Sequence, residues 1–230
     1  MSRHLAIGDI HGCNTALETL IEFVGLRSDD TIVFLGDYVD RGPGTAAVLD
    51  FVIDLRKTHN VIPLRGNHEL MMLDSGEKKS WMHAWLQYGG AETLASYSAS
   101  VNPEDPFADI PAAHMDFLEN QLLAHYECDT HFFVHANADA DKPLDEQPDA
   151  SLYWRRFGNP ERHCSNKIMV CGHTIQESGE PASNGDAICI DTWAYGDGWL
   201  SCLDVESGTV WQANQAGETR MLSLTKTHAA

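Results

Sequence analysis

The sequence predicts an α/β fold built on parallel strands, and three observations support this. The first seventy residues alternate between short apolar runs and segments with apolar residues at helical spacing. The last hundred residues carry further short apolar runs that are typical of strands. The chain has 230 residues, enough for one sizeable hydrophobic core and too few for two comfortable domains. We therefore expect a single domain over residues 1–230.

The first seventy residues indicate the order strand, helix, strand, helix, strand. Strands are expected at residues 5–7, 31–35 and 61–64, and each of them ends at or just before a glycine. Helices are expected over residues 14–24, with Asn14 as a candidate N-cap, and around residues 48–55. Strands that are joined by helices in this way run parallel, with right-handed crossovers.

The rest of the chain predicts helices first and then short strands. Residues 67–123 are mainly helical in pattern, with a break at residues 89–90, and residues 81–123 are expected to form a helical insert. Residues 207–208 indicate a hairpin turn. The later strands are expected at residues 132–134, 168–170, 188–190, 199–205 and 209–211.

Acidic residues dominate the charge balance. There are 34 Asp and Glu against 15 Lys and Arg, which gives a formal net charge of −19, and 12 histidines accompany them. Nucleic acid and anionic membranes are disfavoured as partners, because both bind basic surfaces. The N-terminus reaches Asp9 too soon for a signal peptide, and the six cysteines are scattered without a Cys-x-x-Cys pair. We expect a cytoplasmic protein with reduced thiols.

Polar clusters follow five of the expected strands. The clusters are GDIHG at 8–12, GDYVDRG at 36–42, GNHE at 66–69, HAN at 135–137 and GHT at 172–174. Neighbouring parallel strands end at one edge of the sheet, where open α/β sheets place their ligands. Each cluster alone is weak, because a Gly-Asp pair is often only a turn. Together they supply carboxylate, amide and imidazole donors of the kind that suit a site for two metal ions such as Mn²⁺, Fe or Zn²⁺.

In this order and spacing the clusters resemble the phosphoprotein phosphatase family of calcineurin-like metallophosphoesterases. The resemblance covers about residues 7–211 and is nearest to the small bacterial and phage serine/threonine protein phosphatases. The symmetrical diadenosine tetraphosphatases share the same motifs. The resemblance implies a metallophosphoesterase α/β/β/α sandwich with mixed sheets, and a dinuclear metal site.

The resemblance also implies a role for each motif residue. Asp9 and His11 would hold the first metal ion, Asp37 would bridge both ions, and Asn67, His135 and His173 would complete the second. His68 would be the general acid and Asp40 would orient it. Arg41 and Asn67 would bind phosphate, together with an arginine of the Trp-x-Arg pattern, for which Arg156 is favoured over Arg155. The two divalent ions are expected to be Mn²⁺, with Fe or Zn²⁺ as alternatives.

These roles form a consistent mechanism on chemical grounds. Two divalent ions about 3.5–4 Å apart lower the pKa of a shared water, so that a metal-bridging hydroxide can attack phosphorus directly. His68 can protonate the leaving oxygen, and arginines can pair with the oxygens of the phosphoryl group.

The leading interpretation is a metal-dependent phosphomonoester hydrolase of the serine/threonine protein phosphatase type, with a phosphoprotein or phosphopeptide as substrate. The first alternative is a symmetrical diadenosine tetraphosphate hydrolase. A nuclease is disfavoured by the negative charge. A catalytically silent metal-binding scaffold is the non-enzyme alternative, although no expected ligand is missing. The sequence indicates no oligomeric state.

One departure from the resemblance lies after the last core strand. Related bacterial phosphatases tend to read Ile-Asp-Thr-Gly-Ala, whereas this chain has Trp193 in place of the glycine. The indole is expected to pack on the surface, and the alternative is that it narrows the pocket or stacks on a base.

Overall fold

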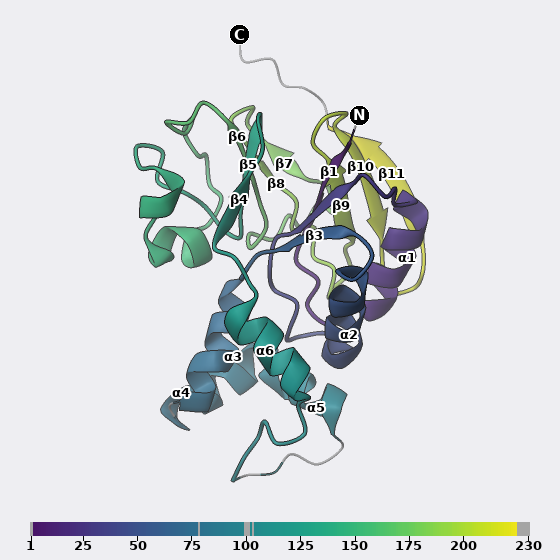
Figure 1. Ribbon diagram of the computed structural model, residues 1–230, viewed down its shortest axis with the longest axis vertical. Coiled ribbons are helices and arrows are strands. Elements are labelled where there is room, and N and C mark those ends of the chain that lie inside the picture. The colour runs from purple at the N-terminus through teal and green to yellow at the C-terminus, as the bar shows by residue number, and fades with distance from the viewer. Residues whose placement is uncertain (1, 78, 99–101, 103, 225–230) are drawn as a thin grey trace.

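The computed structural model describes residues 2–77, 79–98, 102 and 104–224, and it consists of two mixed β-sheets with helices around them (Figure 1). The first sheet has the order β11-β10-β9-β1-β2-β3 and the second has the order β4-β5-β6-β8-β7. The expected α/β class with mixed sheets is confirmed. None of the described helices is long and apolar enough to cross a membrane.

The first sheet contains the parallel unit that the sequence predicts. Its strands are β1 (His4–Ile7), β2 (Thr31–Phe34), β3 (Asn60–Pro63), β9 (Leu200–Asp204), β10 (Thr209–Ala213) and β11 (Thr219–Ser223). Strand β2 pairs in parallel with β1 and with β3, whereas β9 adds to the other side of β1 antiparallel. Gly208 has a φ of 73° at the predicted hairpin turn between β9 and β10.

Helices α1 (Asn14–Val24) and α2 (Thr45–Leu55) connect the parallel strands. Their apolar side chains join one hydrophobic cluster with alternate residues of β1 and β2, as helices that cover a sheet do. The expected cap at Asn14 is wrong, because Cys13 occupies the N-cap position and caps with no side-chain hydrogen bond. Asn14 begins the helix, and its side chain lies where a Cβ on Gly44 would stand.

The second sheet packs against the inner face of the first. Its strands are β4 (His125–Glu127), β5 (His131–Val134), β6 (Ile168–Cys171), β7 (Ala182–Ser183) and β8 (Ala187–Cys189). The alternation of side chains places Ala6 and Val33 of the first sheet in one buried cluster with Phe133 and Val170 of the second. This shared core fixes the strand ends of both sheets relative to each other.

The outer face of the second sheet is covered by short helical turns. These are the 3₁₀ turn η2 (Leu144–Glu146) and the π-helical turn η3 (Ala150–Trp154), whose buried side chains pack with Phe132 and Met169. The last layer of the expected sandwich is therefore thinner than the layer formed by α1 and α2. Strands β4, β7 and β11 were not predicted, because they are short or carry few apolar residues.

The helical insert hangs below the two sheets in Figure 1. It consists of α3 (Asn67–Glu77), α4 (Lys79–Trp85), the π-helical turn η1 (Leu86–Gly90), α5 (Ala91–Tyr97) and α6 (Ala112–Asn120). Helical structure thus begins at Asn67, before the expected insert, and α6 ends before residue 123. The predicted break is present, since Gly89 has a φ of 111° inside a kinked turn.

Candidate active site

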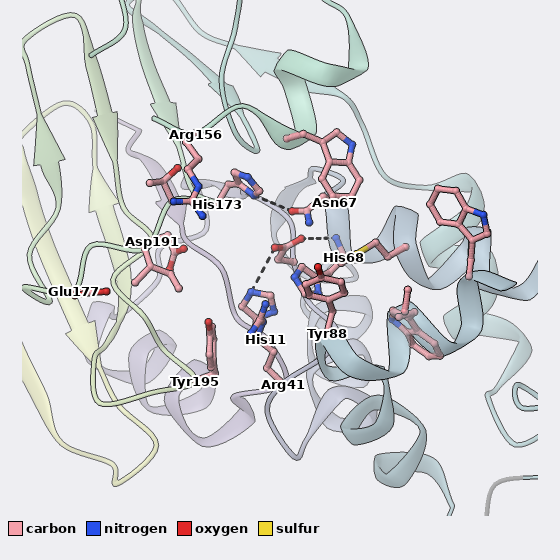
Figure 2. A pocket seen from close by; sticks show the side chains of 18 residues that line it. His11, Arg41, Asn67, His68, Tyr88, Arg156, His173, Glu177, Asp191 and Tyr195 are labelled. Atoms are coloured by element: carbon pink, nitrogen blue, oxygen red, sulfur yellow. Dashed lines mark hydrogen bonds and ion pairs between the residues drawn. The ribbon is translucent and has the colours of Figure 1, made fainter. Parts of the chain in front are cut away.

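The predicted site residues all lie just beyond strands or short helices, at the edge where the two sheets meet. They follow β1 (Asp9, His11), β2 (Asp37, Asp40, Arg41), β3 (Asn67, His68), β5 (His135), β6 (His173) and η3 (Arg156). The structure brings these side chains together. Figure 2 labels six of them: His11, Arg41, Asn67, His68, Arg156 and His173.

The backbone at this edge is strained. His11, Asp37, Asp40, Arg41 and His173 have positive φ angles between 47° and 72°, which residues other than glycine seldom adopt. Each such conformation costs roughly 1–3 kcal/mol and persists only where surrounding contacts impose it. Here backbone hydrogen bonds tie the loops together, such as His11 N–H to the Asp37 carbonyl at 2.8 Å. The strain turns the polar side chains toward one point.

Two glycines allow the carboxylates to reach that point. A Cβ on Gly66 would lie 2.0 Å from Asp37 Oδ1, and a Cβ on Gly172 would lie 1.9 Å from Asp9 Oδ1. Any side chain at either position would displace a carboxylate. The glycines beside the motifs are therefore needed for close approach.

Asp37 lies between two histidines at the centre of the site. Its Oδ2 is 3.5 Å from His11 Nε2, and its Oδ1 is 3.6 Å from His135 Nε2. Burial alone raises the pKa of Asp37, but the neighbouring histidines His135, His68 and His11 bring it below its usual value. Asp37 is therefore a carboxylate that presents one oxygen to each side.

The ring nitrogens facing Asp37 and Asn67 are acceptors. His11 Nδ1 lies 2.9 Å from the Val39 carbonyl and His135 Nδ1 lies 2.9 Å from the Leu35 carbonyl, so each Nδ1 carries the proton. Burial lowers the pKa of both rings, that of His11 to about 3, and keeps them neutral. Their Nε2 lone pairs therefore point inward, the arrangement of metal-binding histidines.

Asn67 Oδ1 lies near two ring nitrogens, one of them the His135 Nε2 already described. It lies 2.9 Å from His135 Nε2 and 2.9 Å from His173 Nδ1. The His173 ring also hydrogen-bonds the backbone of Trp154, and burial with His135 lowers its pKa to about 4. With the proton of His173 engaged there, three acceptor atoms converge with no hydrogen between them. A cation is what such a cluster of lone pairs binds.

Two further buried carboxylates, Asp9 and Asp191, lie near Asp37. Asp9 accepts the backbone N–H of His173 at 3.1 and 2.9 Å, and burial together with Asp191 and Asp37 raises its pKa well above the usual value. Burial likewise raises the pKa of Asp191 to about 7. Asp191 follows β8 and was not predicted as a site residue, although its position after a strand is the signal that identified the others.

The donor set therefore fits divalent metal ions. In the described part of the chain, two groups of ligand atoms lie within 4.8 Å of one another: His11, Asp37 and His68, and Asp37, His135 and His173. Asp37 belongs to both groups. Asp9, which was predicted as a ligand of the first metal ion, is absent from the first group. His68, which was predicted as the general acid, belongs to that group instead.

His68 is held by a carboxylate rather than by a backbone carbonyl. Its Nδ1 lies 2.7 Å from Asp40 Oδ2, and Asp40 is completely buried. Burial alone lowers the pKa of His68, but Asp37 and Asp40 raise it above its usual value. His68 is thus the ring in the site that favours the protonated form.

Two residues of the helical insert fix Asp40. Trp85 Nε1 donates to both carboxylate oxygens at 3.0 and 2.9 Å, and Thr93 Oγ1 donates to Oδ1 at 2.9 Å. The Asp40 N–H in turn donates to Thr93 Oγ1 at 2.7 Å. Neither residue was predicted, because both lie about fifty positions from Asp40 and only the fold brings them near.

Glu69 holds the loop after β2. Its carboxylate accepts from the N–H groups of Asp37 at 2.9 Å, Tyr38 at 2.8 Å and Gly66 at 2.8 Å. The residue is completely buried and its pKa is raised to about 7, chiefly by burial and by Asp37. Glu69 therefore orders the backbone of this loop.

Arg41 stacks on an aromatic ring that was not predicted. Its guanidinium carbon lies 4.8 Å from the ring centre of Tyr195, and its backbone N–H donates to the Gly89 carbonyl at 3.2 Å. Its buried Nε has no hydrogen-bond partner among the described residues.

Trp193, which stands where related phosphatases tend to have glycine, has a φ of 66°. This positive φ explains why glycine suits the position. The indole of Trp193 does not line the site cavity.

The structure separates the two candidate arginines after η3. Arg156 lines the site cavity, whereas Arg155 forms an ion pair with Asp139 at 2.5 Å on another surface. The cavity has a volume of about 600 Å³ and is lined by four of the six predicted ligands (His11, Asp37, Asn67 and His173), by both Arg41 and Arg156, and by several aromatic side chains.

This geometry agrees with comparisons to known proteins. The sequence profile of the calcineurin-like phosphoesterases matches residues 2–197, and the chain belongs to this family. The bis(5'-nucleosyl)-tetraphosphatase (symmetrical) of Neisseria gonorrhoeae is 40% identical over 97% of this chain and 99% of its own length. The protein of the same name from Acidovorax ebreus is 48% identical over 29% of this chain, a match that spans about a quarter (24%) of that relative.

Solved structures share the fold at low sequence identity. A candidate diadenosine tetraphosphatase superposes with a TM-score of 0.64 at 20% identity, covering 96% of this chain and 93% of the other. A cold-active protein-tyrosine phosphatase from Shewanella superposes with a TM-score of 0.63 at 18% identity, covering 96% of this chain and 80% of the other. At such identities the likeness concerns the fold alone.

The leading interpretation from the sequence, a serine/threonine protein phosphatase, is wrong. The relative that matches this chain end to end is named a symmetrical tetraphosphatase of dinucleosides, which favours the alternative. The error has a clear cause, because the metal and phosphate motifs are common to both kinds of enzyme. The motifs define the reaction centre and leave the remainder of the substrate open.

Proposed function

We propose that this chain hydrolyses symmetrical dinucleoside tetraphosphates into two nucleoside diphosphates. The observation that carries the proposal is the end-to-end match to the Neisseria gonorrhoeae tetraphosphatase at 40% identity. The site supports it independently, since a cavity of about 600 Å³ contains two arginines beside a metal-type donor cluster. A long, highly charged substrate can use all of these groups, whereas a single phosphate group would need fewer of them.

In this proposal six side chains hold two divalent ions, of which Mn²⁺ is our first choice. The ligands are Asp9, His11, Asp37, Asn67, His135 and His173, and Asp37 contributes an oxygen to each side. When bound, two divalent ions lower the pKa of water and neutralise phosphate charge. The neutral rings and the Asp37 carboxylate are already in the protonation state that such ions need.

The protein's own residues bind the phosphates and deliver a proton. Arg41, Arg156 and Asn67 line the cavity and bind phosphoryl oxygens. His68, protonated and oriented by Asp40, donates from Nε2 to the departing oxygen. A departing nucleoside diphosphate needs this proton less than an alcohol would, because the second pKa of a phosphate group is about 6.

The test is a comparison of specificity constants on one metal-loaded preparation. We expect kcat/KM for diadenosine tetraphosphate to exceed that for a phosphoserine peptide by at least about 100-fold, which corresponds to ~2.7 kcal/mol of binding in the transition state. Asp37→Asn should abolish turnover of both, and Asp29→Asn, which changes an exposed acid, is the matched control. A preference for the phosphopeptide, or turnover that survives Asp37→Asn, contradicts the proposal.

A further inference from the structure

Exposed apolar side chains are concentrated around the site cavity. Seven large hydrophobic residues of the described chain are exposed, and four of them line this cavity: Trp81, Tyr88, Trp154 and Ile175. The three aromatic ones leave 47%, 54% and 46% of their surface exposed, respectively. A polyphosphate alone offers nothing for such surface to bind, so the apolar lining indicates a second chemical part of the ligand.

The aromatic residues form two separate walls. Trp81 and Tyr88 belong to α4 and η1 of the helical insert, whereas Trp154 ends η3 beside the second sheet. Figure 2 shows Tyr88 and Arg156 apart, with His173 and Asn67 between them in that view. The donor cluster therefore has an aromatic wall on the insert and another on the body of the protein.

Each wall is linked to the site through its backbone. Tyr88 precedes Gly89, whose carbonyl accepts the Arg41 N–H at 3.2 Å. Trp154 stands two positions before Arg156, and its backbone hydrogen-bonds the ring of His173. The cavity thus has two arginines and aromatic side chains from two separate parts of the chain.

This duplication matches a ligand with two similar ends. A dinucleoside tetraphosphate has a charged centre and one base at each end, whereas a phosphopeptide or a phosphomonoester has a single group beyond its phosphate. Aromatic side chains stack on bases of any sequence, and each such contact is worth roughly 1–3 kcal/mol. The cavity therefore contains contacts for both parts of such a ligand: arginines and the metal-type cluster for the phosphates, and aromatic side chains for the bases.

We propose that Trp154 stacks on one nucleobase of the substrate, and that Tyr88 of the insert, where Trp81 also lines the cavity, stacks on the other. The inference rests on the proposed function and assigns the residues that distinguish a dinucleotide from other phosphate esters. It also gives the helical insert a role in binding, because one of the two walls belongs to it.

The experiment compares a substrate that has bases with one that has none. Trp154→Ala and Tyr88→Ala are assayed on diadenosine tetraphosphate and on inorganic tripolyphosphate. We expect the ratio of the two kcat/KM values to fall about tenfold in each variant, mainly through a higher KM for the dinucleotide. Trp154→Phe should retain most of the ratio. Phe23→Ala, which removes an exposed aromatic from α1 outside the cavity, is the matched control and should leave the ratio unchanged.

A binding measurement separates this inference from the proposed function. Binding of diadenosine tetraphosphate is followed by quenching of tryptophan fluorescence with a chelator present. The affinity should be about tenfold weaker in Tyr88→Ala, a variant that keeps every tryptophan. If Tyr88→Ala binds the dinucleotide about tenfold more weakly than the wild type but the wild type hydrolyses no dinucleotide, the proposed function falls and the base contact of Tyr88 stands. If the kcat/KM ratio is unchanged in both alanine variants and binding is unchanged in Tyr88→Ala, or if both substrates lose kcat/KM equally, the base contacts are overturned.

Discussion

Two histidine–aspartate pairs join the helical insert region to the rest of the molecule, and they differ in ways that indicate different uses. His68 Nδ1 lies 2.7 Å from Asp40, and His114 Nε2 lies 3.0 Å from Asp50. Both histidines are buried, but the side chain of Asp40 is fully buried whereas that of Asp50 is 74% exposed. The second nitrogen of His114 is bound by the Tyr97 hydroxyl at 2.9 Å. His68 instead belongs to the donor cluster that faces the cavity.

A short His–Asp contact does not by itself make a proton donor. What distinguishes His68 is a carboxylate held out of water by Trp85 and Thr93, together with a ring that lines the cavity. His114 has both nitrogens engaged and a partner that water screens. We therefore assign a chemical role to the first pair and a packing role to the second.

Replacing each histidine in turn tests the different roles of His68 and His114 with the largest expected effect. His68→Asn should lower kcat for diadenosine tetraphosphate by about 100-fold, the low end of general acid catalysis, because phosphate is a good leaving group. His114→Asn should leave kcat within about twofold but lower the free energy of unfolding by roughly 1–2 kcal/mol, since a buried ring loses its hydrogen bonds. Steady-state kinetics and urea unfolding measure both. Equal kinetic losses in the two variants contradict the assignment.

The carboxylates offer a second, smaller contrast. Asp40→Asn keeps the shape of the side chain but removes the charge that favours protonated His68, so kcat should fall about tenfold or more. Asp50→Asn should change kcat and stability little, because exposed ion pairs contribute about 0–1 kcal/mol. If Asp50→Asn proved as damaging as Asp40→Asn, burial of the carboxylate would not be the deciding difference.

A third prediction concerns the hold that the insert has on Asp40. Trp85→Phe removes the indole N–H that reaches both carboxylate oxygens but keeps an aromatic ring in a buried position. A charge-assisted hydrogen bond is worth roughly 1.5–3 kcal/mol, and only part of its loss reaches His68 through Asp40. We therefore expect kcat to fall by a few-fold to about tenfold with KM nearly constant. Trp199→Phe, at a tryptophan outside the cavity, is the control. A change in KM alone would contradict a positioning role for Trp85.

The smallest expected effect is on the pH dependence of stability in metal-free protein. The raised pKa of His68 means that its protonated form stabilises the fold fully below the unfolded pKa of about 6.5. That contribution disappears as the pH rises through the higher folded pKa. Asp40→Asn should therefore cost more unfolding free energy near about pH 5.5 than near about pH 9. Urea unfolding at the two values measures it, and a cost that grows toward high pH contradicts the assignment.

Local patterns were enough to predict the frame of the site. The apolar runs before Gly8, Gly36 and Gly66 predicted the parallel strands, and the strand ends placed Asp9, Asp37 and Asn67 at one edge. Strand ends converge for topological reasons, so the sequence contains this information directly. That the whole chain is a single domain stays a prediction, as do the individual roles of the metal and phosphate residues.

The surroundings of the site could not be predicted in the same way. Trp85, Thr93 and Tyr195 contact Asp40 and Arg41 across long separations in the sequence, and nothing in their own neighbourhoods indicates this. The thin outer layer of the second sheet depends on packing of η2 and η3, which have no strong helical pattern. The prediction of the substrate class failed for a related reason. The motifs that supported it are shared by enzymes that act on different substrates.

The products of the reaction test the central claim most directly. Diadenosine tetraphosphate is incubated with the Mn²⁺-loaded protein and the nucleotides are separated by anion-exchange chromatography at early times. We expect ADP as the only nucleotide product, with two molecules formed for each substrate molecule consumed. At the same enzyme concentration, His68→Asn should form ADP at no more than about one hundredth of the wild-type rate. AMP and ATP in equal amounts, or an intact dinucleotide beside a rapidly hydrolysed phosphopeptide, would contradict it.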